Sequence, residues 1–355
     1  LAQLQGVGLR RASRAALARI AGAVPGEASE IHYRIDWQPV EADAIAARAL
    51  AAPGQVHESL RAGFRELAAQ HGLSIYGGLL HELDRLSLAH VADALRVLGF
   101  DATLGRRFTV ARESAALGIV PAHARLFARL LDWLVEERVL LRCGPELEIA
   151  AALPPGCAAD AYERLIAQYA PVDGELLTLQ RCGPQLGQVL SGRQDPLQLL
   201  FPGGSLAEAR KLYVDSPFAR TYNGALAAAL EAAIARVPPS SRLRVLEIGA
   251  GTGGTTTYVV PRLPAERCEY TFTDVSPLFL ERAATQFAQF PFVRRTLLDI
   301  DKDPGAQSIE PGRYDIVIAA NVLHATSDLR QAVRHAARLL APGGWLLLLE
   351  GIAPQ

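Results

Sequence analysis

The sequence predicts an α/β protein in which a doubly wound, mostly parallel sheet follows a mainly helical region containing a winged-helix-like unit. Three observations indicate this fold. After residue 240, apolar runs alternate with helical segments, which is typical of parallel strands covered by helices on both faces. Before residue 240, an Ala- and Arg-rich helical pattern dominates. Within that region, residues 113–155 read as short helix, turn, long helix and two short strands, the element order of a winged helix.

Residues 1–40 form the first predicted division of the chain. The stretch LRRASRAALARIAGAVPGEASE, residues 9–30, has the spacing of a short amphipathic helix that breaks at Pro25 and Gly26. The stretch IHYRIDWQPV follows it, and its alternation of apolar and polar residues predicts one half-buried strand.

A helical lid with the winged-helix-like unit is predicted for residues 41–155. Apolar residues recur at helical spacing between residues 56 and 100, and we expect Gly72, the pair Gly77-Gly78 and Gly99 to break them into two or three packed helices. The winged-helix order then places Pro121 in the turn between its two helices.

A winged helix can bind DNA, so the charges on its second helix matter. That helix carries Arg125 and Arg129, but also Asp132, Glu136 and Glu137, which would repel a phosphate backbone. The formal net charge of −1 provides no basic field across the chain. The sequence therefore argues against a nucleic-acid partner and favours a packing or docking module.

Composition excludes several other classes of protein. The chain is 50% hydrophobic and 21% charged, which is typical of globular domains, and it has no apolar run long enough to cross a membrane. The four cysteines are far apart and seven of the eight histidines are scattered without ligand spacing, so we expect no metal site and a reducing, cytoplasmic setting. The absence of methionine indicates a piece of a longer protein.

The remaining divisions are a helical segment over the ligand site, residues 156–240, and the sheet domain, residues 241–355. Continuous apolar runs predict the strands of that sheet at residues 242–249, 270–276, 293–300, 314–322 and 344–350.

A glycine-rich turn follows the first of these strands. In RLRVLEIGAGTGGTTTYVVPRL, Gly249, Gly251 and Gly253 let the backbone approach a ligand at the carboxyl edge of the sheet. The dinucleotide spacing GxGxxG is also satisfied, by Gly254, and it does not decide which ligand binds. Glu247 indicates the ligand better, because a carboxylate repels a phosphate and attracts a cationic amino group. A ligand with both an adenosine and an amino acid is S-adenosylmethionine.

Acidic residues at the next two strand ends agree with this ligand. Asp274 follows the second strand, where a carboxylate accepts hydrogen bonds from both ribose hydroxyls. Asp299 and Ile300 follow the third strand and are expected to provide a carboxylate and an apolar wall for the adenine. Asn321, after the fourth strand, completes the expected cofactor contacts. A lone acid at a strand end is often a helix cap, but three successive ones after this turn favour a ligand.

The chain resembles the carbon methyltransferase domain of modular polyketide synthases. The resemblance rests on VLEIGAGTGGTTTYVVPRL, YTFTDVSPLFLERA, FPFVRRTLLDID and YDIVIAANVLHATSDLRQAVRHAARLLAPGGWLLLLEG, and on LLTLQRCGPQLGQVLSGRQDPLQL and LFPGGSLAEARKLYVDSPFARTYNGAL before the sheet. The start of the chain, GLRRASRAAL and YRIDWQP, is similar to the end of a dehydratase domain and its linker. The resemblance is weaker from residue 41 to 110.

The resemblance implies methyl transfer from S-adenosylmethionine to the α-carbon of a β-ketoacyl thioester on an acyl carrier protein, with neighbouring synthase domains as further partners. It implies that His324 is the general base and that Glu350, at the end of the fifth strand, orients it. The family's helix before the core closes over the site, which makes Tyr213, Tyr222 and Asn223 candidates for contacts with the cofactor or the substrate. Packing is the competing explanation for the tyrosines.

One departure from the family leaves alternatives open. Such cores end with a sixth and a seventh strand, whereas this chain stops directly after the fifth. We expect either a fragment cut at this point or a degenerate, non-catalytic domain that acts as a scaffold between its neighbours. Methylation of oxygen is a third possibility, because a histidine base can also deprotonate a hydroxyl.

Overall fold

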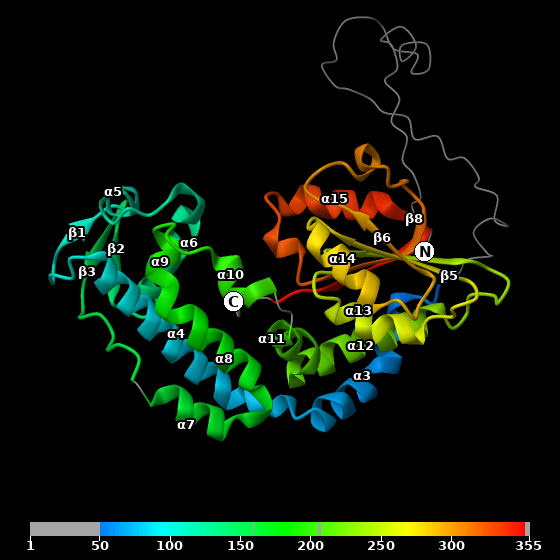
Figure 1. The fold of residues 1–355 in the computed structure, drawn as a ribbon, viewed down its shortest axis with the longest axis horizontal. Helices are drawn as coiled ribbons and strands as arrows, with labels where there is room; N and C mark the ends of the chain where they lie inside the picture. The colour runs from blue at the N-terminus through cyan, green and yellow to red at the C-terminus, as the bar shows by residue number, and fades with distance from the viewer. Residues whose placement is uncertain (1–49, 159, 205–206, 352–355) are drawn as a thin grey trace, which may run out of the picture.

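The computed structural model describes residues 50–158, 160–204 and 207–351. These residues form a helical lobe with a small sheet and a lobe built on a larger sheet, joined along one side by helices α3 and α12 (Figure 1). The helix and the strand predicted within residues 1–40 lie outside the described residues. The domain boundaries predicted at residues 40, 155 and 240 stay predictions.

The larger sheet is fully parallel, as predicted. Its strand order is β6-β5-β4-β7-β8, so the chain starts in the middle and winds outward in both directions. The strands are β4 (Leu243–Ile248), β5 (Cys268–Asp274), β6 (Val293–Leu297), β7 (Tyr314–Ala320) and β8 (Leu340–Leu349). This topology places the carboxyl ends of β4 and β7 side by side, which is where ligands bind in doubly wound sheets.

Helices cover both faces of this sheet. Alternate residues of β4 face opposite sides, so Val245 joins one apolar core while Leu246 joins the other. The first core is covered by α12 (Pro217–Ile234), α13 (Gly254–Val259) and α14 (Pro277–Gln286), and the second by α15 (Leu329–Leu339). The prediction of a doubly wound sheet is confirmed.

Two strand ends differ from the prediction by three residues or more. β6 ends at Leu297 because only the amide of Leu298 still reaches Asp274, whereas the amide of Asp299 donates to the Gln307 side chain. β8 starts at Leu340, four residues earlier than predicted. Its first part holds a register irregularity opposite Tyr314, where a Cβ on Gly344 would lie 2.9 Å from two carbonyl oxygens.

The helical lobe begins with two long helices, α3 (Pro53–Gln70) and α4 (Tyr76–Leu98), separated by the 3₁₀ turn η1 (Leu73–Ile75). Gly72 and Gly99 adopt left-handed backbone and end these helices, as expected. The prediction that Gly77 and Gly78 break the chain is wrong, because both lie within α4. Gly78 is needed for packing instead, since a Cβ there would lie 2.9 Å from the Tyr169 hydroxyl.

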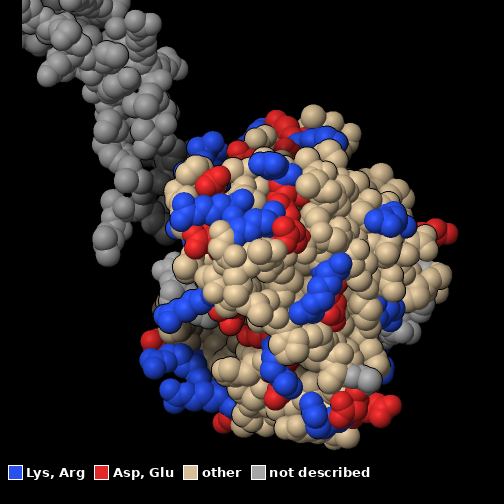
Figure 2. All heavy atoms as spheres, turned by 90° about the vertical axis from the view of Figure 1, so that its left-hand side faces the viewer, with Lys and Arg blue, Asp and Glu red and all other residues tan. Residues whose placement is uncertain are grey.

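The predicted winged-helix-like order follows α4. The unit consists of β1 (Arg107–Phe108), α5 (Val110–Ala116), α6 (Ala124–Glu136), β2 (Leu140–Cys143) and β3 (Glu146–Ile149), with β1-β3-β2 as an antiparallel sheet. Its charged side chains pair with one another, since Arg129 binds Glu136 at 2.8 Å and Arg107 binds Glu148 at 2.7 Å. Both basic and acidic side chains are present on this face (Figure 2).

Short helices connect this unit to the core. They include α7 (Ala161–Gln168), α8 (Asp173–Cys182), α9 (Leu186–Leu190), α10 (Pro196–Leu200), α11 (Ala207–Arg210) and a single π-helical turn η6 (Lys211–Asp215). The Ser216 hydroxyl then caps α12 by accepting a hydrogen bond from the Ala219 amide. Among the described residues, no helix has the length and apolar character needed to cross a membrane.

Candidate active site

The glycine-rich turn has the backbone conformation that its sequence predicts. Gly249, Gly251 and Gly253 have φ values of 56°, 55° and 74°, a region that side chains rarely tolerate. A Cβ on Gly249 would overlap the Val322 side chain. At the start of α13, a Cβ on Gly254 would lie 2.7 Å from the Tyr213 carbonyl oxygen. Glycine therefore lets the turn lie close to the segments before α12 and after β7.

Glu247 is buried beneath this turn. Its Oε2 atom accepts hydrogen bonds from the Thr256 hydroxyl and from the Tyr270 hydroxyl, the latter at 2.5 Å. Burial raises the pKa of Glu247 to about 7, although the two hydroxyls oppose the shift. A carboxyl with this pKa would ionise more readily beside a cation.

Asp274 supports the turn from the neighbouring strand. Its Oδ2 atom accepts from the Gly251 amide at 2.9 Å, and its Oδ1 atom accepts from the Ser276 amide at 2.8 Å. Burial raises the pKa of Asp274, while these amides oppose that effect. The structure thus gives Asp274 a role in holding the glycine turn, and its contact with a ribose stays a prediction.

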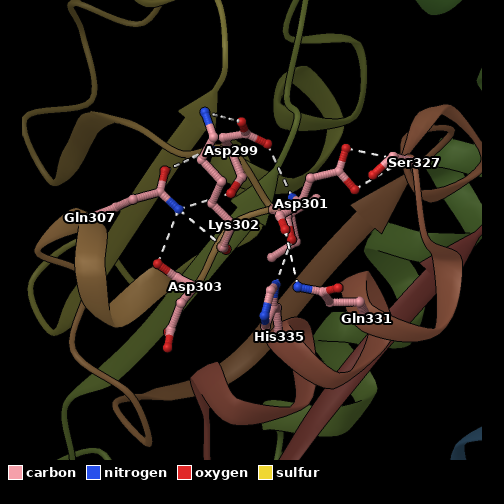
Figure 3. Close-up of polar contacts among 9 residues, drawn as sticks. Asp299, Asp301, Lys302, Asp303, Gln307, Ser327, Gln331 and His335 are labelled. Atoms are coloured by element: carbon pink, nitrogen blue, oxygen red, sulfur yellow. Dashed lines mark hydrogen bonds and ion pairs between the residues drawn. The ribbon is translucent and has the colours of Figure 1, made fainter.

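The segment after β6 is fixed by a polar network (Figure 3). The Asp299 carboxylate pairs with Lys302 at 2.9 Å, and this hydrogen bond lowers its pKa. The Ile300 side chain is buried in the core on the α15 face, and its carbonyl accepts from His335 Nδ1 at 2.7 Å. The Asp301 carboxylate accepts from the Ser327 amide, which joins this segment to the one after β7. The predicted adenine contacts of Asp299 and Ile300 remain untested.

A pocket of about 250 Å³ opens beside the glycine turn, and we call it the glycine-turn pocket. It brings together many of the predicted residues with several others; its lining is Phe201, Tyr213, Asn223, Glu247, Gly249, Ala250, Gly251, Thr252, Gly254, Thr255, Phe279, Ala320, Asn321 and His324. Gly253, Asp274, Asp299 and Ile300 are not part of that lining.

A second, more apolar pocket of about 370 Å³ lies under the helical lobe, and we call it the lid pocket. Its walls come from α4, α8, η6 and α12 and from the ends of β7 and β8; they are Tyr76, Leu80, Leu83, Glu175, Leu212, Tyr213, Ser216, Phe218, Ala219, Tyr222, Asn223, Asn321, His324 and Leu349. Tyr213, Asn223, Asn321 and His324 line both pockets. The two cavities therefore meet at these side chains.

His324 and Glu350 form a hydrogen-bonded pair at this junction. His324 Nδ1 lies 2.6 Å from Glu350 Oε2, and the histidine side chain is 61% exposed. Glu350 Oε1 accepts from the Val322 and Leu323 amides at 2.9 and 2.7 Å. Burial raises the pKa of Glu350, but the bonds from His324 and the two amides outweigh it, so the net pKa is lowered. When the imidazole donates its Nδ1 proton to the Glu350 carboxylate, Nε2 is the ring nitrogen left to act as a base.

Asn321 connects this pair to the sheet. Its φ of 52° is a left-handed conformation at the end of β7, and its amide donates to the Leu349 carbonyl at 2.7 Å. Asparagine is one of the non-glycine residues that adopt this left-handed conformation most readily. The turn places His324 beside Glu350 at the adjacent strand end.

The residues predicted before α12 have distinct surroundings. Asn223 is buried, donates to the Tyr213 carbonyl at 3.2 Å and accepts from the Thr255 hydroxyl at 2.9 Å, so it ties η6 to α13. Tyr222 packs against Phe218 with ring centroids 4.4 Å apart. Tyr213 lines both pockets, and burial raises the pKa of its phenol.

Several lining residues could not be singled out in the sequence, among them two phenylalanines and a Tyr–Glu pair. Phe201 and Phe279 stand edge to face with centroids 5.7 Å apart on the glycine-turn pocket, and they come from segments far apart in the chain. Tyr76 and Glu175 meet in the lid pocket, where the Tyr76 hydroxyl donates to Glu175 Oε1. Phe279 follows Asp274 at the end of β5 by five residues, so its position after a strand end could have indicated a pocket residue. The local sequence around the other three residues gives no such indication.

Comparison with known proteins relates this site to one group of enzymes. Residues 246–346 match a family described as methyltransferase domain. The crystal structure of the CurJ carbon methyltransferase is similar with a TM-score of 0.82 and 37% identity, over 86% of this chain and 81% of that one. The CMeT domain of the citrinin polyketide synthase has a TM-score of 0.72 and 25% identity, over 84% and 80% of the two chains.

The curated relatives with similar sequences are polyketide synthases. The polyketide synthase ThaG of Burkholderia thailandensis is 38% identical over 289 residues, which is 78% of this chain and 5% of that protein. The non-reducing polyketide synthase ausA of Emericella nidulans is 34% identical over 75% of this chain and 11% of its own length. The chain thus spans a small part of the curated relatives it matches.

Proposed function

Because this chain belongs to the carbon methyltransferase domains of polyketide synthases, we propose that it methylates the α-carbon of a β-ketoacyl thioester carried on an acyl carrier protein. The observation that carries the proposal is the position of His324, which lines both pockets and has Glu350 behind it. A base at the junction of two cavities can act on a substrate in one while a methyl donor occupies the other.

The cofactor of this family is S-adenosylmethionine, and the glycine-turn pocket suits it. Bound there, it supplies an electrophilic methyl group on a sulfonium. Glycine backbone lines the pocket where side chains would block a ligand, and the buried carboxyl of Glu247 offers a partner for an ammonium group. We assign Glu247, the glycine turn and Asn321 to cofactor binding, with Asp274 supporting the turn.

In the proposed reaction, Nε2 of His324 removes a proton from the α-carbon. The electron pair of the broken C–H bond delocalises into the carbonyl groups, and the resulting enolate carbon becomes the nucleophile for the methyl group, whose bond to the donor sulfur breaks and leaves that sulfur as a neutral thioether. Glu350 stabilises the imidazolium that forms, because it stays ionised and is held by two amides. We propose the Tyr213 hydroxyl as the donor to the enolate oxygen, since Tyr213 lines both pockets.

The lid pocket is proposed as the site of the acyl chain, with an acyl carrier protein and neighbouring synthase domains as partners. Leu80, Leu83, Leu212 and Leu349 give it apolar walls that match an alkyl chain. The exposure of His324 leaves its face accessible to a substrate delivered from outside.

Replacing the base tests this function. His324→Ala should lower methyl transfer to a β-ketoacyl carrier substrate by roughly 10²–10⁴-fold, the contribution of general base catalysis. Affinity for S-adenosylmethionine should stay nearly unchanged. The matched control is His81→Ala, which removes an exposed histidine of α4 outside both pockets. Near-native turnover in His324→Ala would place proton removal elsewhere, and Tyr213 would be the next residue to replace.

The product distinguishes the remaining functions. Mass spectrometry with fragmentation should locate the new methyl group on the α-carbon, whereas a methyl group on oxygen would establish an O-methyltransferase. A flat calorimetric titration of folded protein with S-adenosylmethionine would support a scaffold domain without catalysis.

A further inference from the structure

The lid pocket contains a polar pair that the proposed reaction does not use. Tyr76 at the start of α4 and Glu175 on α8 both line the pocket, and the Tyr76 hydroxyl donates to Glu175 Oε1. Both belong to the helical lobe, whereas His324 and Glu350 belong to the sheet. The pocket thus has the acidic group Glu175 on its lid wall and His324, the proposed base, on its core wall.

Placing this carboxyl in a largely apolar pocket is unfavourable. Glu175 Oε2 is buried and has no hydrogen-bond partner among the described residues, and the leucine side chains of α4 line the same pocket. An unsatisfied buried polar atom in a native protein calls for an explanation, and a missing ligand is one. Burial raises the pKa of Glu175, as expected for a carboxyl that lacks a full set of donors.

The contacts of the pair define the chemistry that would complete it. The proton of the Tyr76 hydroxyl is used by Oε1, which leaves Oε2 as an acceptor. We propose that Glu175 determines substrate specificity by accepting a hydrogen bond from a hydroxyl group of the acyl chain beyond its β-carbon. Tyr76 is a positioning residue that holds the carboxylate. The inference rests on the proposed function and adds the substrate class to it.

The position of the hydroxyl follows from the two walls. The α- and β-carbons must lie at His324 on the core wall for proton removal, so a group that reaches α8 on the lid wall is further along the molecule. An amide N–H of the pantetheine arm is the other donor on such a substrate, and the experiment separates the two sources.

The test compares pantetheine thioesters of β-oxohexanoate, its δ-hydroxy derivative and its δ-methoxy derivative. Dissociation constants are measured by calorimetry without cofactor, and kcat/KM is measured with S-adenosylmethionine. We expect the intact chain to prefer the δ-hydroxy compound about tenfold, because the other two compounds cannot donate a hydrogen bond to Glu175 Oε2. Glu175→Leu and Glu175→Gln should remove most of that preference, and Tyr76→Phe should reduce it while ring packing on Phe218 is kept.

Tyr169→Phe is the matched control, because this tyrosine packs on Gly78 of the same lobe and lines neither pocket. The control should keep the tenfold preference. If the Glu175 variants bind all three thioesters more weakly by the same factor, the carboxylate contacts the pantetheine arm and the inference is overturned. It is also overturned if the preference for the δ-hydroxy compound is the same in these variants as in the intact chain. If Glu175→Leu fails to fold, the nearly isosteric Glu175→Gln carries the test.

Failure of this inference and failure of the proposed function are distinguishable. A preference for the δ-hydroxy compound in binding, without any methyl transfer, would contradict the proposed function alone. Methyl transfer at equal efficiency to all three compounds would contradict the role of Glu175 alone.

Discussion

At the scale of single residues, Glu350 has two tasks that one carboxylate performs together. One oxygen accepts from His324 and the other from two backbone amides, which fixes the plane of the carboxylate. Glu350→Gln keeps the shape and removes the charge that stabilises the imidazolium. We expect kcat to fall by about 10- to 100-fold, less than for His324→Ala, because the imidazole remains in place. Single-turnover rates of methyl transfer measure both effects, and a larger loss in Glu350→Gln would contradict this order.

Glu247 makes cofactor binding depend on pH. Its pKa in the folded protein is raised from 4.5 to about 7, so the free protein loses stability from this group as pH rises through that range. A bound ammonium group favours the ionised form, so affinity for S-adenosylmethionine should rise with pH up to about 7 and then level off. Below that pH, the dissociation constant should increase by up to about tenfold per unit. Calorimetry across pH 5.5 to 8.5, in roughly half-unit steps, checks this, and Glu247→Gln should give a flatter profile.

Contacts between residues at neighbouring strand ends could be predicted from the sequence. The pairing of β7 with β8 places the segment holding His324 next to Glu350, and strand order alone predicts it. The ion pair between Asp299 and Lys302 could not be predicted from the sequence, because an exposed ion pair depends on side-chain rotamers that the sequence does not encode. Phe201 was also unpredictable, since its contact with Phe279 spans two lobes of the chain.

At the scale of elements, the glycine turn is fixed by its neighbour as well as by its own backbone. Gly249→Ala introduces a Cβ that overlaps Val322 at a φ of 56°. We expect about 1–2 kcal/mol of destabilisation from the backbone alone, and more from the overlap. Adding Val322→Ala should restore part of the loss, because the two side chains then no longer meet. Urea unfolding of the four variants of this cycle gives the coupling energy, and strict additivity would argue against the contact.

The control for this cycle is Gly343→Ala. Gly343 also has a positive φ, of 76°, but a Cβ there meets no atom within 4 Å. It should show the backbone cost alone, and Val322→Ala should not change it.

Helices and strands could be predicted where tertiary packing does not override the local sequence pattern. The apolar runs of β4, β5 and β7 are buried on both faces, and these strands begin and end within two residues of the expected positions. Gly77 and Gly78 look like a helix break in the sequence, but tertiary packing overrides their low helix propensity within α4. The start of β8 at Leu340 could not be predicted, because proline and glycine residues such as Pro342 usually end a strand.

At the scale of the whole molecule, cofactor binding should stabilise the fold. One glycine-turn pocket predicts a stoichiometry of one S-adenosylmethionine per chain. A ligand at a hundred times its dissociation constant adds about 2.7 kcal/mol to the free energy of unfolding. Calorimetric titration measures the stoichiometry, and thermal unfolding with and without the cofactor measures the stabilisation. A stoichiometry of two, or an unchanged melting temperature, would contradict the assignment of this pocket.

The overall architecture was predictable because it repeats a simple rule. Alternating strands and helices allow few topologies for a parallel sheet, so the doubly wound order followed from the pattern of residues 242–350. The arrangement of the helical lobe over the sheet did not follow, since it depends on contacts such as those of α3 with α12 that no local pattern records. The lid pocket, and with it Tyr76 and Glu175, could be recognised only in the folded chain.

The junction of the two pockets implies thermodynamic linkage between their ligands. Tyr213, Asn223, Asn321 and His324 face both cavities, and Asn223 ties the π-helical turn to α13. If binding of one ligand rearranges these side chains and so changes the affinity of the other ligand, the second ligand changes the affinity of the first by the same factor, since coupling free energies are reciprocal. A substitution at one of these four residues that weakens cooperativity measured from one cavity must therefore weaken it equally when measured from the other.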